Sequence, residues 1–137
     1  MLRPRVGFAV DPTDLIVTVR YIGAIGGDQI VPAVLESFAA VERAWDYDCI
    51  FDLSRHSGLV ELRDNDALAK GWLNLTGGRD AGRRTAVVSS DPLIDARLPL
   101  IQPMFPFRTL MTFASVEAAR GWLLASRTEE ARGVSAA

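Results

Sequence analysis

The chain has 137 residues, of which 49% are hydrophobic and 23% are charged, and this fits one globular domain that buries roughly two thirds of its unfolded surface. Aromatic residues at 8%, seven prolines and eleven glycines give no signature of a collagen-like repeat, a coiled coil or a disordered chain. The formal net charge of -2 is too small to indicate a nucleic-acid partner, so we expect none.

Residues that bind metals or form disulfides are scarce. Cys49 is the only cysteine and His56 the only histidine, so thiolate and histidine ligands cannot be combined into a zinc site. The N-terminus lacks the apolar segment of a secretory signal, and no apolar run approaches the roughly 20 residues of a membrane span. We therefore expect a cytoplasmic protein without a metal, a cofactor or a membrane span.

The first part of the chain predicts an antiparallel hairpin and a helix. Residues 6–10 and 15–22 are apolar, β-branched stretches on either side of the turn sequence Asp-Pro-Thr-Asp at 11–14. Asp28 then offers an N-cap for an amphipathic helix whose apolar residues recur at three- and four-residue spacing as far as Trp45.

Strands and helices alternate in the remainder of the chain. The predicted elements are a central strand at 49–51, a polar corner at 54–61, a helix at 62–75, a strand at 86–88, a helix from Asp91 towards Gln102, a strand at 107–113 and a last helix from Ser115. This order predicts an α/β fold, with a mainly parallel sheet of about five strands opened by an antiparallel hairpin, and about four helices. We expect one domain over 1–127 and a tail at 128–137 that frays, because its residues are small and polar.

Three local stretches carry a family resemblance. They are Ile-Phe-Asp-Leu-Ser at 50–54, Arg-Thr-Ala-Val-Val-Ser-Ser-Asp-Pro-Leu at 84–93 and Phe-Ala-Ser-Val-Glu-Ala-Ala-Arg-Gly-Trp-Leu at 113–123. Combined with the order of elements, they resemble the STAS-like family of small bacterial proteins over about residues 5–126. That family is related to the anti-sigma-factor antagonists and is grouped by fold with the CRAL-TRIO lipid-binding domains. The resemblance implies a STAS-like fold and a non-enzymatic regulatory module, because its motifs are packing motifs and none is a catalytic signature.

The resemblance also implies candidate contact residues. The antagonists carry a phosphorylated serine in an Asp-Ser-Ser-Gly-Leu motif, and the nearest match in this chain is His56-Ser57-Gly58-Leu59. The acidic residue is absent and histidine precedes the serine, so Ser57 aligns only loosely with the phosphorylated position. Ser54, His56, Ser57 and Gly58 are accordingly the candidates for a partner contact or a phosphorylation switch.

The same segment contains the residue types of a hydrolase triad. Asp52, Ser54, His56 and Ser57 follow a predicted central strand, and open α/β sheets bind their ligands at the ends of such strands. Triad members usually come from distant points in the sequence, however, and no Gly-x-Ser-x-Gly elbow occurs. We therefore expect no enzymatic activity and keep a weak hydrolase that uses Ser57 and His56 as the second alternative.

Residues 93–107 hold more apolar side chains than the buried stripe of one helix requires. Core packing, a homodimer interface or an apolar ligand cleft would each cover them, which makes candidates of Trp72, Leu98, Met104 and Phe105. The leading hypothesis is a module that binds another protein or a second copy of itself, as a homodimer, through residues 54–59 and the helix at 62–75. The first alternative is a carrier of a small apolar or lipid-like ligand near Trp72, Met104 and Phe105.

Overall fold

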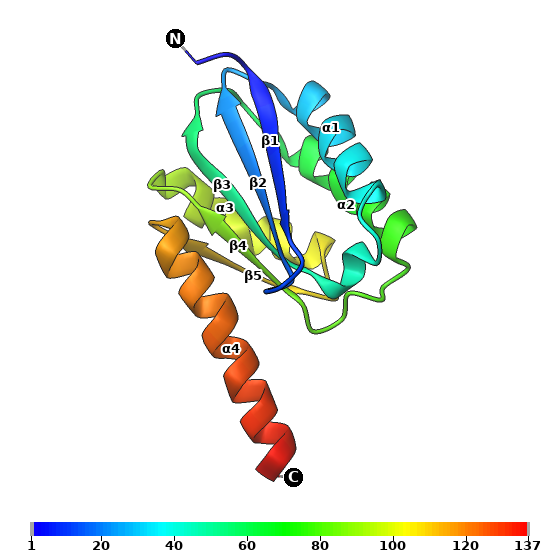
Figure 1. The fold of residues 1–137 in the computed structure, drawn as a ribbon. Coiled ribbons are helices and arrows are strands. Elements are labelled where there is room, and N and C mark those ends of the chain that lie inside the picture. Colours follow the sequence, from blue (N-terminus) through cyan, green and yellow to red (C-terminus); the bar gives the residue numbers. More distant parts are fainter. Residues whose placement is uncertain (1, 137) are drawn as a thin grey trace.

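The computed structural model describes residues 2–136, and the side chains of residues 2–130. Five strands form one sheet in the order β1 (Arg5–Asp11), β2 (Ile16–Gly23), β3 (Asp48–His56), β4 (Arg84–Val88) and β5 (Thr109–Phe113). The first two strands are antiparallel, and the pairs from β2 to β5 are parallel (Figure 1). The predicted mainly parallel sheet with an opening hairpin is therefore confirmed.

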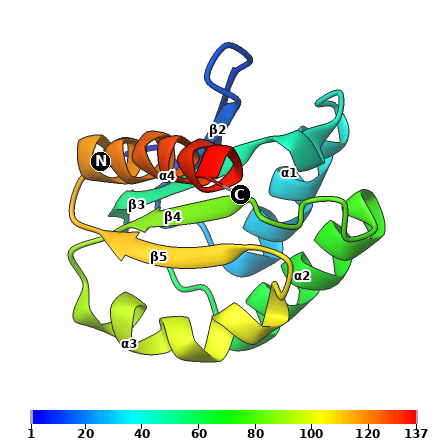
Figure 2. The ribbon, with the colours of Figure 1, turned by 90° about the horizontal axis from the view of Figure 1, so that it is seen from below.

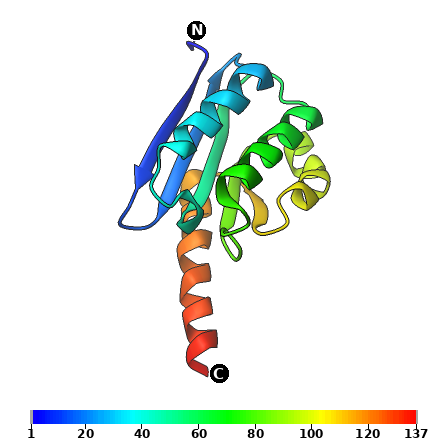
Figure 3. The same ribbon diagram turned by 90° about the vertical axis from the view of Figure 1, so that its right-hand side faces the viewer.

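Helices cover both faces of the sheet. Figure 2 shows α1 (Gly27–Ala39), α2 (Leu62–Thr76) and α3 (Pro92–Ile101) on one face and α4 (Val116–Ala136) on the other. Two short 3-10 helices, η1 (Ala44–Asp46) and η2 (Gln102–Met104), follow α1 and α3. As Figure 3 shows, α1 and α2 lie side by side across the sheet, and α4 continues past the edge of the sheet.

Two apolar clusters fill the spaces between these layers. The larger one joins the sheet to α1 and α2 and includes Val19, Phe38 and Trp72. The smaller one joins the sheet to α4 and includes Ile50 and Leu123. Helix α3 differs from the other helices on its face because none of its residues is buried, although six of its ten residues are leucine, isoleucine or alanine.

The prediction for the first helix is wrong at both ends. Gly26, in an extended conformation, occupies the N-cap position, and Asp28 lies inside the first turn, where its carboxylate suits the helix dipole. The helix ends at Ala39, and Trp45 lies in η1. Arg43 has a left-handed backbone with φ of 54°, which turns the chain out of the helical path before Trp45.

The central strand is longer than predicted. We expected residues 49–51 to form the strand and the corner to begin at residue 54, but β3 extends to His56. The extension pairs with the end of β2, where Ile22 lies opposite Arg55 and Gly23 lies opposite His56. Ser54 and His56 are therefore strand residues, and the true corner begins at Ser57.

Two arginines of α4 bind residues of the opening hairpin and of the start of β3. The guanidinium of Arg120 lies 3.0 Å from Asp11 Oδ2 and also contacts Asp14, while Arg127 lies within 3.0 Å of Asp48 Oδ2 and Leu15 O. Beyond residue 127, Glu130 Oε1 lies 3.4 Å from Arg84 Nη2 of β4. The fraying of residues 128–137 remains a prediction, and residue 137 lies outside the described part. None of the described helices combines the length and the apolar character needed to cross a bilayer.

Candidate functional site

Residues 54–59, called here the corner segment, end β3 and begin the link to α2. Main-chain hydrogen bonds hold the segment against the loop that precedes α1. The N–H of Ser57 donates to the carbonyl of Gly23 at 2.9 Å, and the N–H of Gly27 donates to the carbonyl of Leu59 at 3.3 Å. The corner segment is thus fixed at the carboxyl edge of the sheet, where open α/β sheets place their binding sites.

His56 has a structural position in this arrangement. Its Nε2 donates to the carbonyl oxygen of Ile25 at 2.7 Å, and its ring packs edge-on against Tyr21 with the ring centroids 5.5 Å apart. Because a carbonyl oxygen only accepts hydrogen bonds, Nε2 must carry a proton. Gly58 lies so close to the same loop that a Cβ at this position would overlap the carbonyl oxygen of Ile25.

The serines of the corner segment are not placed for a catalytic triad. Ser54 Oγ donates to Asp52 Oδ1 at 2.6 Å, and Arg20 Nε lies 3.7 Å from the second oxygen of this carboxylate. No hydrogen bond joins His56 to Ser54 or Ser57 among the described residues. The sequence neighbours therefore do not form the nucleophile, base and orienting acid that a hydrolase requires, whereas Ser54 and Ser57 both remain exposed.

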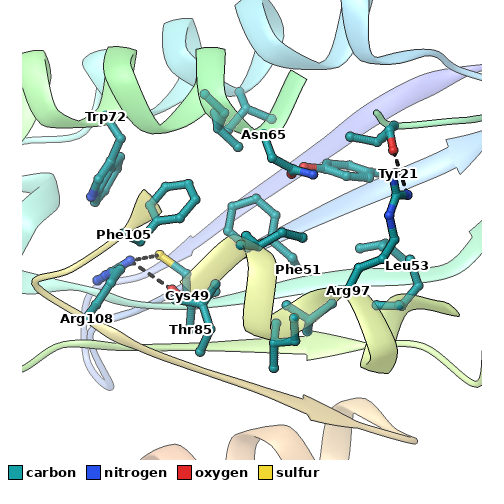
Figure 4. A pocket seen from close by; sticks show the side chains of 18 of the residues that line it. Tyr21, Cys49, Phe51, Leu53, Asn65, Trp72, Thr85, Arg97, Phe105 and Arg108 are labelled. Carbon is teal, nitrogen blue, oxygen red and sulfur yellow. Dashed lines mark hydrogen bonds between the residues drawn. The ribbon is translucent and has the colours of Figure 1, made fainter. Parts of the chain in front are cut away.

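A separate cavity of about 110 Å³ lies between the sheet, α2 and α3 (Figure 4). Most of its lining is apolar. Three of the four residues predicted for a cleft or a dimer contact, Trp72, Leu98 and Phe105, line it. Met104 is half-buried in η2 and is not part of the lining. The cavity thus lies between the two helices for which the apolar excess at 93–107 made a ligand cleft one of the alternatives, and the binding of a ligand there remains a prediction.

A buried ionic cluster closes the inner end of the cavity. Arg108 lies with Nε 3.1 Å from Asp80 Oδ2, and both side chains are at least 96% buried. Arg108 also donates to Cys49 Sγ at 3.2 Å, to Thr85 Oγ1 at 3.1 Å and to the carbonyl of Tyr47 at 2.8 Å. The contact between Nε and Asp80 is a charge contact without an aligned hydrogen bond, since Nε itself has no acceptor in line.

Asp80 is shared by several donors. Trp72 Nε1 donates to Asp80 Oδ2 at 2.7 Å, and Thr76 Oγ1 lies 3.5 Å from its other oxygen. The Arg108 guanidinium also lies over the Trp72 ring, 5.1 Å from its centroid. Neither residue stands out in the sequence, because Asp80 lies in a predicted loop, Arg108 lies in the predicted strand at 107–113, and no spacing relates them.

Polar side chains also gather at the other end of the cavity. Figure 4 shows Tyr21, Asn65 and Arg97 towards that end, where Leu53 also lies. Arg97 Nη1 donates to the carbonyl of Val60 at 3.1 Å, which connects α3 to the chain that leaves the corner segment. We call Tyr21, Asn65 and Arg97 the outer polar group.

Two buried acids predict a loss of stability in alkaline solution. Burial raises the pKa of the Cys49 thiol, against the effect of nearby Arg108, and burial raises the pKa of the Tyr21 hydroxyl. In an unfolded chain these groups ionise near pH 8.5 and near pH 10, so above about pH 8.5 the folded state binds more protons. The free energy of unfolding is therefore expected to fall as the pH rises.

Urea unfolding at a series of pH values between about 7 and 10.5 would measure this dependence. Tyr21→Phe should make the decline above about pH 9.5 shallower, since phenylalanine has no proton to lose. A free energy of unfolding that stays constant over this range would contradict the burial of both groups.

No group of three or more potential metal ligands comes together within the described residues.

No protein-family model and no curated protein sequence matches the chain. A solved structure does resemble it: an uncharacterised protein of the DUF3478 family from Shewanella loihica PV-4, described as having a SpoIIAA-like fold. The two chains are 17% identical, the alignment covers 90% of this chain and 95% of the other, and the TM-score is 0.58. The likeness shows that this chain has a SpoIIAA-like fold, which agrees with the predicted STAS-like fold.

Proposed function

We propose that this protein is a non-enzymatic regulatory module of the STAS type, which acts by binding another protein through the corner segment and the adjoining helix α2. The observation that carries the proposal is the combination of exposure and rigidity in the corner segment. Ser54, Ser57 and Leu59 are exposed there, and Leu59 is 63% exposed. A binding surface that is already fixed before association loses little conformational entropy when a partner binds.

The fixed state of the corner segment rests on three contacts with the loop before α1. They are the hydrogen bonds of Ser57 and Leu59, the hydrogen bond from His56 and the close approach of Gly58. His56 and Gly58 thus position the segment, and Ser54 and Ser57 are the residues available for contact or phosphorylation. The hydroxyl groups of Ser54 and Ser57 would contact a partner directly. Phosphorylation of either serine would change the local charge by nearly two units.

The geometry weighs against the hydrolase alternative because the proton on His56 Nε2 faces a carbonyl oxygen and neither serine forms a hydrogen bond with the ring among the described residues.

A second copy of the chain stays a candidate partner. Leu93 and Leu100 of α3 are 66% and 57% exposed, and self-association would cover them.

Ser57→Asp is expected to change partner capture without changing the fold. The new carboxylate mimics part of the charge of a phosphoryl group at the exposed centre of the proposed surface. Tagged wild-type protein and the variant would be used to capture proteins from a lysate of the source organism, with quantification by mass spectrometry. We expect at least one protein whose recovery changes about fivefold or more, a change in binding free energy of about 1 kcal/mol.

Ala81→Asp supplies the matched control, because it adds the same charge at an exposed residue near the opposite edge of the sheet. This control should leave capture unchanged, and thermal melting of both variants would verify their folds. Equal capture by the wild type, Ser57→Asp and Ala81→Asp would contradict the proposed surface.

A further inference from the structure

We infer that the cavity beneath α3 binds a small aromatic or compact apolar carboxylate, with its apolar part in the cavity and its carboxylate at the outer polar group. This inference goes beyond the proposed partner surface and does not depend on it. It rests on the volume of the cavity, on the charge at its outer end and on the packing of α3.

The volume of the cavity limits the ligand to about the size of one ring. An engineered apolar cavity of about 150 Å³ is known to accept benzene, and the present cavity measures about 110 Å³. Its central lining consists of side chains such as Phe51, Leu68, Leu98 and Phe105. The enclosed space holds about one ring, so we infer a ligand smaller than the lipid-like molecule considered from the sequence.

The outer polar group determines the charge of the ligand. The guanidinium of Arg97 is occupied only by the carbonyl of Val60, and no carboxylate of the described residues lies within 4.0 Å of it. Tyr21 is buried, and its hydroxyl forms no hydrogen bond with any described residue. The amide of Asn65 lies next to it (Figure 4). A positive charge beside two further donors is complementary to a carboxylate.

The inner end of the cavity, unlike the outer polar group, has no free positive charge for an anion among the described residues. The positive charge of Arg108 is already balanced by Asp80, and its terminal nitrogens bond to Cys49, Thr85 and Tyr47. An acid that entered with its carboxylate first would have to disrupt this cluster. The asymmetry between the two ends therefore orients the ligand with its apolar part inward.

Helix α3 provides the third argument. Ile94, Leu98 and Ile101 line the cavity, and none of them is fully buried. A ring-sized ligand would supply the packing partner that these side chains lack. Binding would also place the carboxylate beside the bond between Arg97 and Val60, which joins α3 to the start of α2.

The test compares three probes of one size and different charge: benzoate, benzyl alcohol and benzylamine. Isothermal titration calorimetry and amide NMR spectra of the full chain would measure their binding. For benzoate we expect saturation with a dissociation constant of roughly 0.1–1 mM, the range set by a ligand of so few atoms. Benzyl alcohol should bind about tenfold more weakly or worse, and benzylamine should not saturate.

Arg97→Gln should weaken benzoate about tenfold and leave the affinity for benzyl alcohol within about twofold. Arg63→Gln is the matched control, since it removes the same charge from an exposed position on α2 and should leave both affinities unchanged. The side chain of Arg97 is half-buried. Tyr21→Phe is a second variant, which removes the hydroxyl donor of the outer polar group without removing a charge.

Several outcomes would overturn the inference. They are no saturable binding of benzoate, equal affinity for benzoate and benzyl alcohol, or equal weakening by Arg97→Gln and Arg63→Gln. Because partner capture by the corner segment is measured separately, failure of either proposal leaves the other intact.

Discussion

Asp80→Ala is expected to lower the free energy of unfolding by about 3–5 kcal/mol, the range observed when one partner of a buried ion pair is removed. The substitution would leave the buried charge of Arg108 without its carboxylate and would remove the acceptor of Trp72 Nε1. Both effects act at the inner end of the cavity, where water cannot easily replace the lost oxygen atoms. Urea unfolding followed by tryptophan fluorescence would measure the change.

Asp66→Ala is the matched control for this prediction. Asp66 pairs with Lys70 on the exposed side of α2, where solvent screens the two charges, so a much smaller loss of stability is expected. The combination of Asp80→Leu with Arg108→Met should recover part of the loss, because it removes both charges from the interior. Similar stabilities for Asp80→Ala and Asp66→Ala would contradict a buried cluster.

Gly58→Ala is expected to destabilise the protein by about 1–3 kcal/mol through overpacking. The added methyl group would overlap the backbone oxygen of Ile25 and would lie 2.9 Å from His56 Nε2. Because the overlapped atom belongs to the main chain, either the corner segment or the loop before α1 must move. Chemical denaturation would give the energy, and amide NMR shifts at residues 23–27 would locate the movement.

Gly121→Ala is the same chemical change, but it is expected to raise the stability that Gly58→Ala lowers. Gly121 lies in α4, and a Cβ at this position meets no atom within 4 Å, so the substitution should stabilise the protein by about 0.5–1 kcal/mol. If Gly58→Ala were as stable as the wild type, the corner segment could not be seated on the loop before α1, and its proposed rigidity would be wrong.

The fold followed from the sequence where local chemistry and periodicity coincide. The turn at 11–14 and its flanking β-branched residues predict the hairpin, and Asp91 with Pro92 predicts the start of α3, where Asp91 accepts from the N–H of Leu93. These features depend on residues close together in the chain. They therefore leave a signal that does not need the tertiary structure.

The limits of β3 and of the first helix did not follow, because tertiary partners decide them. Residues 54–56 are polar and show no strand alternation, yet Arg55 and His56 pair with the end of β2 after a register shift. The helix ends at Ala39, before the apolar repeat does, and the left-handed Arg43 then turns the chain so that Trp45 lies in η1.

The candidate site was predictable in part. The apolar excess in 93–107 and the position of Trp72 pointed to a space between two helices, and a cavity lies there. The buried pair of Asp80 and Arg108 could not be foreseen, because it depends on how one loop packs against another. The outer polar group likewise combines residues from a strand and two helices.

Native mass spectrometry of the protein, purified gently from its own organism, tests the regulatory proposal most directly. One spectrum reports bound proteins, bound small molecules and covalent modification together. The proposed function predicts a co-purified protein partner, or a phosphoryl-sized mass increment that maps to Ser54 or Ser57. An unmodified monomer without any partner protein, even one that carries a small carboxylate, would contradict a module that acts by binding another protein through its corner segment.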